Sequence, residues 1–152
     1  MQHTGEPPID DVDAALEAIN AYPDFDTHGY GRWACVLKEH GVDSAPIGFC
    51  GLKFLDDMGE VDVGYRFLPD YWGRGLATES TRVCVDFGFT TLGLDHVCAF
   101  VLAANRGSIR VLEKVGMKRA ADVVYDGQAA QRWVLTRADW GFARQGRAEL
   151  QP

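Results

Sequence analysis

The chain has 152 residues, 47% of them hydrophobic, and a formal net charge of −7. Its length and hydrophobic content suit a single domain with a sizeable core, and its acidic balance argues against a nucleic-acid surface, which needs clustered Lys and Arg. No apolar run approaches the roughly 20 residues of a membrane span, and the N-terminus shows no signal pattern, so we expect a cytoplasmic protein without a membrane partner.

The spacing of the cysteines and histidines does not indicate a metal site. The cysteines lie inside apolar segments without a CxxC pattern, which predicts buried, reduced thiols, and the histidines have no ligand spacing, so no metal is expected. These residues are Cys35, Cys50, Cys84, Cys98, His3, His28, His40 and His96. We expect one domain whose core covers about residues 10–137, with loose tails at 1–9 and 142–152.

The first half of the chain is predicted to hold one helix and three strands. Residues 10–21 place apolar side chains at helical spacing, with acids near the start, and residues 22–31 are typical of a loop. Residues 32–39 and 47–55 have strand composition, and the Gly, Asp, Ser and Pro residues between them favour an antiparallel hairpin. Residues 60–68 alternate apolar and polar side chains, the period of a half-buried strand.

The second half is predicted to alternate helices and strands. A helix is expected at residues 75–91 and a strand at 96–102. Asn105 has the character of a helix N-cap, and Gly116 closes that helix. Two further strands end the domain, and Asp126-Gly127 between them is a strong hairpin signal. This order predicts an α/β or α+β domain in which helices cover a mixed sheet.

A glycine-bearing loop joins the third strand to the next helix, in the stretch GYRFLPDYWGRGLATES at residues 64–80. Backbone N–H groups and the helix dipole favour an anion at such a helix N-terminus. A side chain at Gly73 or Gly75 would hold a phosphate away from the backbone, and Arg74 can add a charge-assisted contact. The loop matches neither a P-loop nor GxGxxG, and the glycines can equally serve only to shape the turn.

Two linked stretches, YWGRGLATES and LGLDHVCAFVLAANRGSIRVLEKVGMKR, closely resemble the GNAT superfamily of N-acetyltransferases, and more specifically its RimJ/RimL-like (ribosomal-protein N-acetyltransferase-like) branch. The resemblance covers about residues 30–137. The family's loop pattern, Gln/Arg-x-x-Gly-x-Gly/Ala, maps onto residues 72–77, where Trp72 departs from the usual Gln or Arg. The resemblance implies a mixed, mostly antiparallel sheet flanked by helices, the acyl-CoA N-acyltransferase fold, and acetyl-CoA as co-substrate.

By this resemblance, acetyl-CoA would lie across the loop and the strand before it. Its pyrophosphate would rest on N–H groups of residues 73–78, and its pantetheine arm would pair with the backbone of residues 65–68, in a slot where strands 60–68 and 96–102 part. Asn105 would contact the cofactor amide, unless capping is its only role. The cofactor residues so expected are Tyr65, Phe67, Leu68, Trp72, Gly73, Arg74, Gly75, Leu76, Ala77, Thr78 and Asn105.

The family reaction is direct attack of an amine on the thioester, with a hydroxyl group to stabilise the departing thiolate. Many family members carry a tyrosine where this chain has Leu112. In the RimL-like branch a serine one turn into the helix takes that role, which by this resemblance falls to Ser108 here. The alternative is an ordinary serine on a helix surface.

The attacking amine must be neutral, which sets the demand on a general base. Reference pKa values of about 8 for an α-amine and about 10.4 for lysine leave about one α-amine in ten, but fewer than one lysine in a thousand, neutral at pH 7. Glu60 and Asp62 are candidate bases acting through water. Strand alternation can instead put both away from the slot, as ordinary solvated carboxylates. His96, Asp126 and His28 are weaker candidates.

Family members begin with a further strand and helix that are missing before residue 10 here, and that helix forms part of the acceptor wall. The strand near Trp33 would then be a sheet edge, which favours a homodimer that covers it. Two functions stay open. One is an acetyl-CoA-dependent N-acetyltransferase for a protein N-terminus or a small amine. The other is a non-catalytic acyl-CoA-binding module or a degenerate relative.

Overall fold

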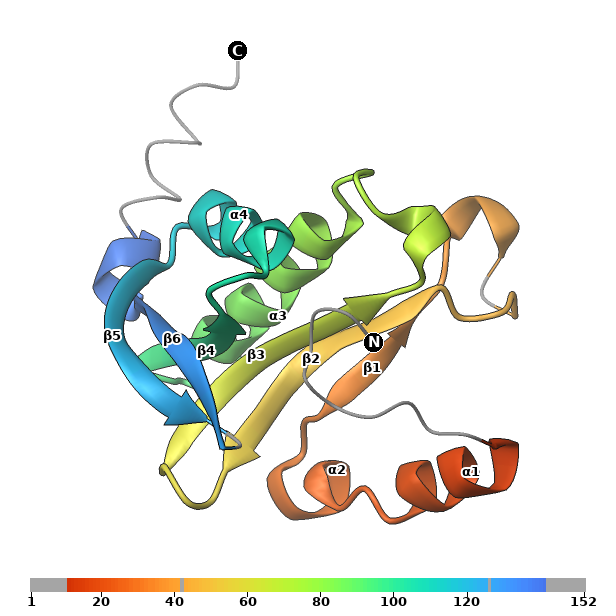
Figure 1. Ribbon diagram of the computed structural model, residues 1–152. Coiled ribbons are helices and arrows are strands. Elements are labelled where there is room, and N and C mark those ends of the chain that lie inside the picture. Colours follow the sequence, from red (N-terminus) through yellow and green to blue (C-terminus); the bar gives the residue numbers. More distant parts are fainter. Residues whose placement is uncertain (1–10, 42, 126, 142–152) are drawn as a thin grey trace.

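The computed structural model describes residues 11–41, 43–125 and 127–141, which fold around one sheet (Figure 1). Helices α1 (Val12–Asn20) and α2 (Asp24–His28) precede strands β1 (Arg32–Cys35), β2 (Gly48–Leu55) and β3 (Glu60–Phe67). Helix α3 (Leu76–Thr90), strand β4 (His96–Leu102) and helix α4 (Arg106–Val115) follow, and strands β5 (Lys118–Tyr125) and β6 (Gln128–Thr136) close the domain. Short 3₁₀ helices span Lys38–His40 and Pro69–Tyr71.

The six strands lie in the order β1-β2-β3-β4-β6-β5. Neighbouring strands are antiparallel except β3 and β4, which are parallel and pair only at Asp62 and Cys98. A parallel pair needs a crossover connection, and α3 provides it. The sheet is therefore mixed and mostly antiparallel, as the sequence predicts, and its two halves part between β3 and β4.

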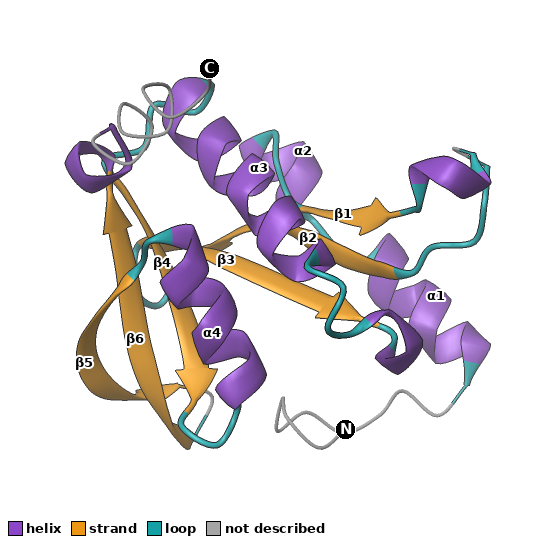
Figure 2. Cartoon of the chain, turned by 90° about the horizontal axis from the view of Figure 1, so that it is seen from above, coloured by secondary structure: helices purple, strands orange, loops and turns teal. Residues whose placement is uncertain are grey.

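Helices α3 and α4 lie side by side on one face of the sheet (Figure 2). Strand alternation turns Leu52, Val61 and Val63 toward α3, whose buried residues include Val85 and Phe89. Each of these five side chains is at most 8% exposed. The core therefore lies between this face and the helices, and the polar even-numbered residues of β3 point to the opposite face.

The predictions for the central elements are confirmed. Gly75 precedes α3, and the Asn105 side chain caps α4 by accepting a hydrogen bond from the Ser108 N–H at 3.0 Å. Gly116 ends α4 with a φ of 99°, a left-handed conformation that glycine adopts readily. The last two strands form the predicted hairpin, with Tyr125 opposite Gln128, although Asp126 of the predicted turn lies outside the described residues.

Two local predictions are wrong. Helix α2 lies inside the segment expected to be a loop, because Asp24 and Asp26 suit a first turn and Gly29, at φ 72°, ends the helix after five residues. A helix this short leaves no periodic signal. Strand β1 ends at Cys35 rather than at residue 39, because Leu37 turns inward to pack with Ile47 and Phe67 in a second apolar cluster.

The outer elements and the cysteines complete the description of the fold. Strand β1 is an edge of the sheet, as predicted, and Trp33 on it is 38% exposed. Helix α1 buries no residue against the other described parts, and its Val12 and Ile19 are 73% and 69% exposed. All four cysteines are free thiols, and all but the half-buried Cys35 are buried. Within the described ranges, no helix combines the length and apolar character needed to cross a membrane.

Candidate active site

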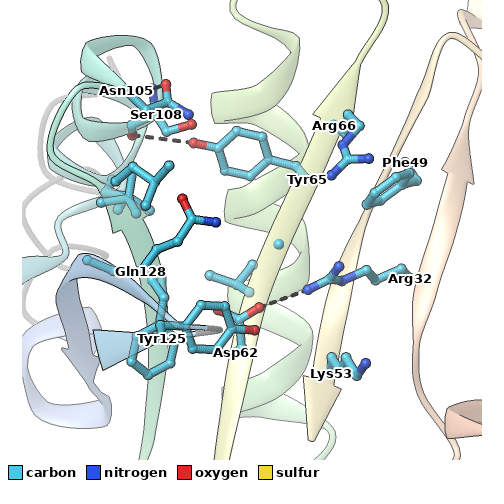
Figure 3. A pocket seen from close by; sticks show the side chains of 18 residues that line it. Arg32, Phe49, Lys53, Asp62, Tyr65, Arg66, Asn105, Ser108, Tyr125 and Gln128 are labelled. Atoms are coloured by element: carbon cyan, nitrogen blue, oxygen red, sulfur yellow. Dashed lines mark hydrogen bonds and ion pairs between the residues drawn. The ribbon is translucent and has the colours of Figure 1, made fainter. Parts of the chain in front are cut away.

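A pocket of about 210 Å³ lies where β3 and β4 part (Figure 3). The Leu68 N–H donates to the Ile47 carbonyl at 2.9 Å, which sets the alternation along β3. Tyr65 and Phe67 therefore turn their backbone groups away from β2 and toward the slot. The expected parting of these two strands is confirmed.

The pocket passes through the sheet from the α4 side to the opposite face. Asn105, Ser108 and Leu112 line it at the α4 end, together with Tyr65. At the other end the lining residues are charged, aromatic or amide-bearing and come from β1, β2, β3, β4 and the β5–β6 hairpin. They are Arg32, Phe49, Lys53, Asp62, Arg66, Phe100, Tyr125 and Gln128. The slot thus connects a hydroxyl-bearing end with a charged end.

At the α4 end, a hydrogen bond holds a tyrosine hydroxyl beside the first turn of the helix. The Tyr65 hydroxyl donates to the Ser108 carbonyl at 3.3 Å, and burial raises the pKa of Tyr65 to about 12. Its phenol is therefore protonated at neutral pH and can give a proton. We expected only the backbone of Tyr65 to contribute to the site, so its side chain is a proton-donor candidate that the sequence reasoning missed. Ser108 is half-buried and lines the same end.

At the charged end, Arg32 crosses β2 to reach Asp62. Its Nη2 donates to an Asp62 carboxylate oxygen at 3.0 Å. The path is open because Gly51 and Gly64 face each other across β2 and β3, and a Cβ on Gly64 would lie 2.5 Å from Arg32 Nη2. Glycines inside two paired strands were the signal in the sequence that could have located this contact.

Asp62 is a buried carboxylate rather than a solvated one. It is 5% exposed, and burial raises the pKa of its carboxyl against the opposing effect of Arg32. The prediction that strand alternation would leave it as an ordinary solvated group is wrong, because its face of β3 is covered by Arg32 and the walls of the pocket. A desolvated carboxyl in a pocket is a functional candidate.

Glu60 lies outside the pocket lining. Arg132 on β6 donates to both of its carboxylate oxygens, in one case at 3.0 Å, and His96 Nε2 lies 3.8 Å away. The hydrogen bonds from Arg132 hold the pKa of Glu60 below its usual value. Glu60 is thus a half-buried ion-pair partner that ties β3 to β6 and lies outside the pocket lining.

The weaker base candidates are also away from the pocket or cannot be placed. His28 packs on the Phe54 ring, with 5.1 Å between ring centroids. His96 lies beside Glu60. Asp126 falls outside the described residues. Of the candidate bases that the structure describes, Asp62 lines the slot.

The glycine-bearing loop is shaped by left-handed backbone. Gly73 and Gly75 have φ values of 75° and 83°, a region that favours glycine. Turn shape therefore already explains both glycines, and close approach of a phosphate is not needed to account for them. A Cβ at either position would meet nothing within 4 Å, so the space in front of the loop is open. Helix α3 begins there and has 15 residues, enough for a well-developed N-terminal dipole.

The side chains of this loop region point to structural partners. Trp72 stands where the family pattern has Gln or Arg, and its Nε1 donates to the Phe67 carbonyl at 2.7 Å. Arg74 Nη2 lies 3.6 Å from Glu39 Oε1, and the Arg74 guanidinium lies over the Tyr71 ring. The other predicted residues beyond β3 are a buried Thr78, an exposed Leu68, and Leu76 and Ala77 beside the second apolar cluster. None of the residues 67–78 is among the pocket lining, so any contribution here comes mainly from backbone N–H groups.

Comparisons with known proteins identify the family. The model of the acetyltransferase (GNAT) domain matches residues 1–118, so the chain belongs to that family. A curated relative, the uncharacterized N-acetyltransferase p20 of Bacillus licheniformis, is 32% identical over 114 residues, which are 74% of this chain and 62% of that protein. The chain thus spans less than two thirds of that relative's length.

Two solved structures show the same fold. An acetyltransferase from Agrobacterium tumefaciens is similar with a TM-score of 0.75 and 21% identity, over 90% of this chain and 77% of that one. A spermidine N-acetyltransferase from Vibrio cholerae, solved in complex with CoA and spermine, has a TM-score of 0.72 and 18% identity, over 92% of this chain and 83% of that one.

Proposed function

We propose that this protein is an acetyl-CoA-dependent N-acetyltransferase that moves an acetyl group to a primary amine. The observation that carries the proposal is the pocket through the sheet. It has a protonated Tyr65 hydroxyl and Ser108 at one end and the buried Asp62 carboxyl at the other. Membership of the GNAT family supports it.

The described residues fit acetyl-CoA as a substrate. The open space before Gly73 and Gly75, at the N-terminus of α3, suits a pyrophosphate held by backbone N–H groups. On β3, the Leu68 N–H is bonded to Ile47 and the Phe67 carbonyl to Trp72. The backbone groups of Tyr65 and the Phe67 N–H are left to face the slot and suit the pantetheine arm.

The reaction needs one proton removed and one delivered. The neutral amine nitrogen attacks the thioester carbonyl, a C–N bond forms, the C–S bond breaks, and the thiolate takes up a proton. Tyr65 and Ser108 supply hydroxyl groups at the α4 end, where the thiolate would depart. Asp62, through a bridging water, is the base that would take the proton from the amine.

The acceptor is a protein N-terminus, as in the RimJ/RimL-like branch, or a small amine. The pocket volume of about 210 Å³ is below the roughly 300–1,000 Å³ typical of drug-sized ligand sites. The charged end therefore holds a small acceptor or the terminal residue of a chain. This size favours the small amine.

Calorimetric titration with acetyl-CoA, together with thiol release over a panel of amines, tests the proposal. We expect binding, release with at least one amine, and a Tyr65→Phe variant that binds acetyl-CoA normally but turns over more slowly. Val124→Ser, on a residue 72% exposed on β5, is the matched control. Binding without release from any amine would favour the acyl-CoA-binding module, and absence of binding would refute both.

We also propose a homodimer through the β1 edge. Trp33 there contacts Phe25 and Phe87 edge-on yet stays 38% exposed, and an exposed strand edge tends to pair. Light scattering over a concentration series should show a dimer. A monomer at the highest concentration would contradict this.

A further inference from the structure

Arg32 and Asp62 form an ion pair beside the slot, although their strands are not neighbours. Arg32 lies on the edge strand β1 and Asp62 on β3, with β2 between them. Arg32 Nη2 donates to Asp62 Oδ2 at 3.0 Å, and the two side chains are 27% and 7% exposed. Both residues line the pocket. The edge strand thus supplies the ion-pair partner of the proposed base.

Packing fixes the position of the Arg32 guanidinium. Asp62 and Gly64 are alternate residues of β3, so they face the same side of the sheet. The guanidinium lies directly on Gly64, because a Cβ there would come within 3.1 Å of its Nε, Cζ and Nη2. The Phe49 ring lies beside it, with its centroid 5.8 Å from Arg32 Cζ. Figure 3 shows the resulting contact of Arg32 with Asp62 as a dashed line.

Stability alone does not explain this pair. Moving two opposite charges out of water costs about as much as their attraction returns, so a buried ion pair is often no more stabilising than apolar side chains in its place. Arg32 Nε is also buried without a hydrogen-bond partner among the described groups, which leaves the guanidinium partly unsatisfied. An arrangement that gives up stability in this way is typical of a functional site.

Charged and titratable groups surround Asp62 on its face of the sheet. Burial raises the pKa of its carboxyl, and Arg32 opposes this more than the Phe100 N–H or Lys53 does. Asp126 lies outside the described residues, and it is present in every variant compared below. The described groups are Arg32 on β1, Lys53 on β2, Glu60 and Arg66 on β3, Cys98 on β4, Tyr125 on β5 and Arg132 on β6, with Tyr65 in the slot.

We propose that Arg32 is a positioning residue for acetyl transfer, which holds the Asp62 carboxylate ionised and oriented to receive the proton of the acceptor amine. This rests on the proposed acetyltransferase function. The amine proton passes to the bridging water, a proton of that water passes to Asp62, and the carboxyl later releases it to solvent. Arg32 binds Oδ2 and neither gives nor takes a proton.

The pH dependence of kcat tests this role, because a purely structural role would not move it. With acetyl-CoA and a reactive amine both saturating, kcat should fall at low pH as Asp62 becomes protonated. Arg32→Gln should move this acid limb to higher pH by about one unit or more, since an arginine beside a carboxyl lowers its pKa by about 1–3 units. Arg32→Lys keeps the charge and should return the limb part of the way.

Matched variants separate positioning from a general disturbance of the pocket. Lys53→Gln removes another cation of the lining and should move the acid limb less than Arg32→Gln does. In an Asp62→Asn background, Arg32→Gln should change kcat by less than about twofold, because the group on which Arg32 acts is gone. Gly64→Ala displaces the guanidinium without removing its charge. It should move the limb in the same direction, and it replaces Arg32→Gln if that variant fails to fold.

A second readout does not depend on turnover. The Asp62 carboxyl can be titrated by ¹³C NMR of aspartate-labelled protein, with its signal assigned by its loss in Asp62→Asn. The midpoint of this titration should also move to higher pH by about one unit or more in Arg32→Gln. Calorimetry with acetyl-CoA checks that each variant still binds the co-substrate.

The outcomes separate this inference from the proposed function. An acid limb at the same pH in the parent and in Arg32→Gln would overturn the inference, as would equal losses of kcat from Arg32→Gln in the parent and Asp62→Asn backgrounds. Full turnover by Asp62→Asn would overturn it too, and would leave an acetyltransferase with another base. No thiol release from any amine would instead contradict the proposed function on which it rests.

Discussion

Replacing Gly64 by alanine should destabilise the protein by breaking the contact between Arg32 and Asp62. The added Cβ would lie 2.5 Å from Arg32 Nη2, the same nitrogen that donates to Asp62 at 3.0 Å. An ordinary contact begins at 3.4 Å, so this nitrogen must move by about 0.9 Å, the difference of the two distances. The guanidinium is the far end of a flexible side chain and can move, but it then loses its hydrogen bond to the carboxylate.

The magnitude follows from two opposing contributions. A hydrogen bond to a charged group contributes about 1.5–3 kcal/mol, and alanine in place of a strand glycine recovers about 0.5–1 kcal/mol of backbone entropy. We expect a net loss of about 1–2 kcal/mol, which lowers the Tm of a chain of this size by about 2–8 °C. Equilibrium unfolding in urea measures the free energy directly.

A double-mutant cycle supplies the control. With Arg32→Ala as the background, the obstructing guanidinium is gone, so Gly64→Ala should be neutral or slightly stabilising. Equal destabilisation in both backgrounds would show that Gly64 is required for another reason, and a Gly64→Ala protein as stable as the parent would refute the close approach altogether.

Three further predictions concern the titration of Glu60, the proposed proton donor Tyr65 and the proposed pyrophosphate site at the N-terminus of α3. Because Arg132 lowers the pKa of Glu60 in the folded state, its stabilisation should be complete above the unfolded value of about 4.3 and lost as pH falls through the lower folded pKa. The difference in unfolding free energy between the parent protein and Glu60→Gln should shrink below about pH 4. A difference that stays constant with pH would contradict this. Burial raises the pKa of Tyr65 to about 12, so its phenol should stay protonated, and kcat should not fall because of its ionisation, between about pH 7 and 10. A fall in kcat over this range that is present in the parent protein and absent in Tyr65→Phe would contradict this prediction. Backbone N–H groups rather than lysines should hold the pyrophosphate, so acetyl-CoA affinity should fall less than about tenfold between 50 and 500 mM salt, and a steeper fall in calorimetry would indicate side-chain cations.

Local rules accounted for most of the elements. Alternation along residues 60–67 marks β3, Asn105 and Gly116 bound α4, and both are confirmed. The errors occur where a tertiary contact overrides local preference. Leu37 leaves the strand direction to pack with Ile47 and Phe67, and the five-residue helix α2 is too short to produce a period.

The features of the site also fall into those that follow from local sequence and those that depend on tertiary contacts. The sequence by itself determined the turn at Gly73 and Gly75, the cap at Asn105 and the family resemblance, because these depend on backbone conformation and on residues close together in the chain. Only the tertiary structure decided which polar groups share the pocket. Arg32 binds Asp62, which is 30 residues away in the sequence, and Tyr65 binds Ser108, which is 43 residues away. Glu60 binds Arg132, 72 residues away, instead of lining the pocket. Such encounters depend on which strands pair and in which register, which no local pattern encodes. Gly51 and Gly64 mark a close approach in the sequence, but only the register shows that they face each other and that Arg32 lies beside them.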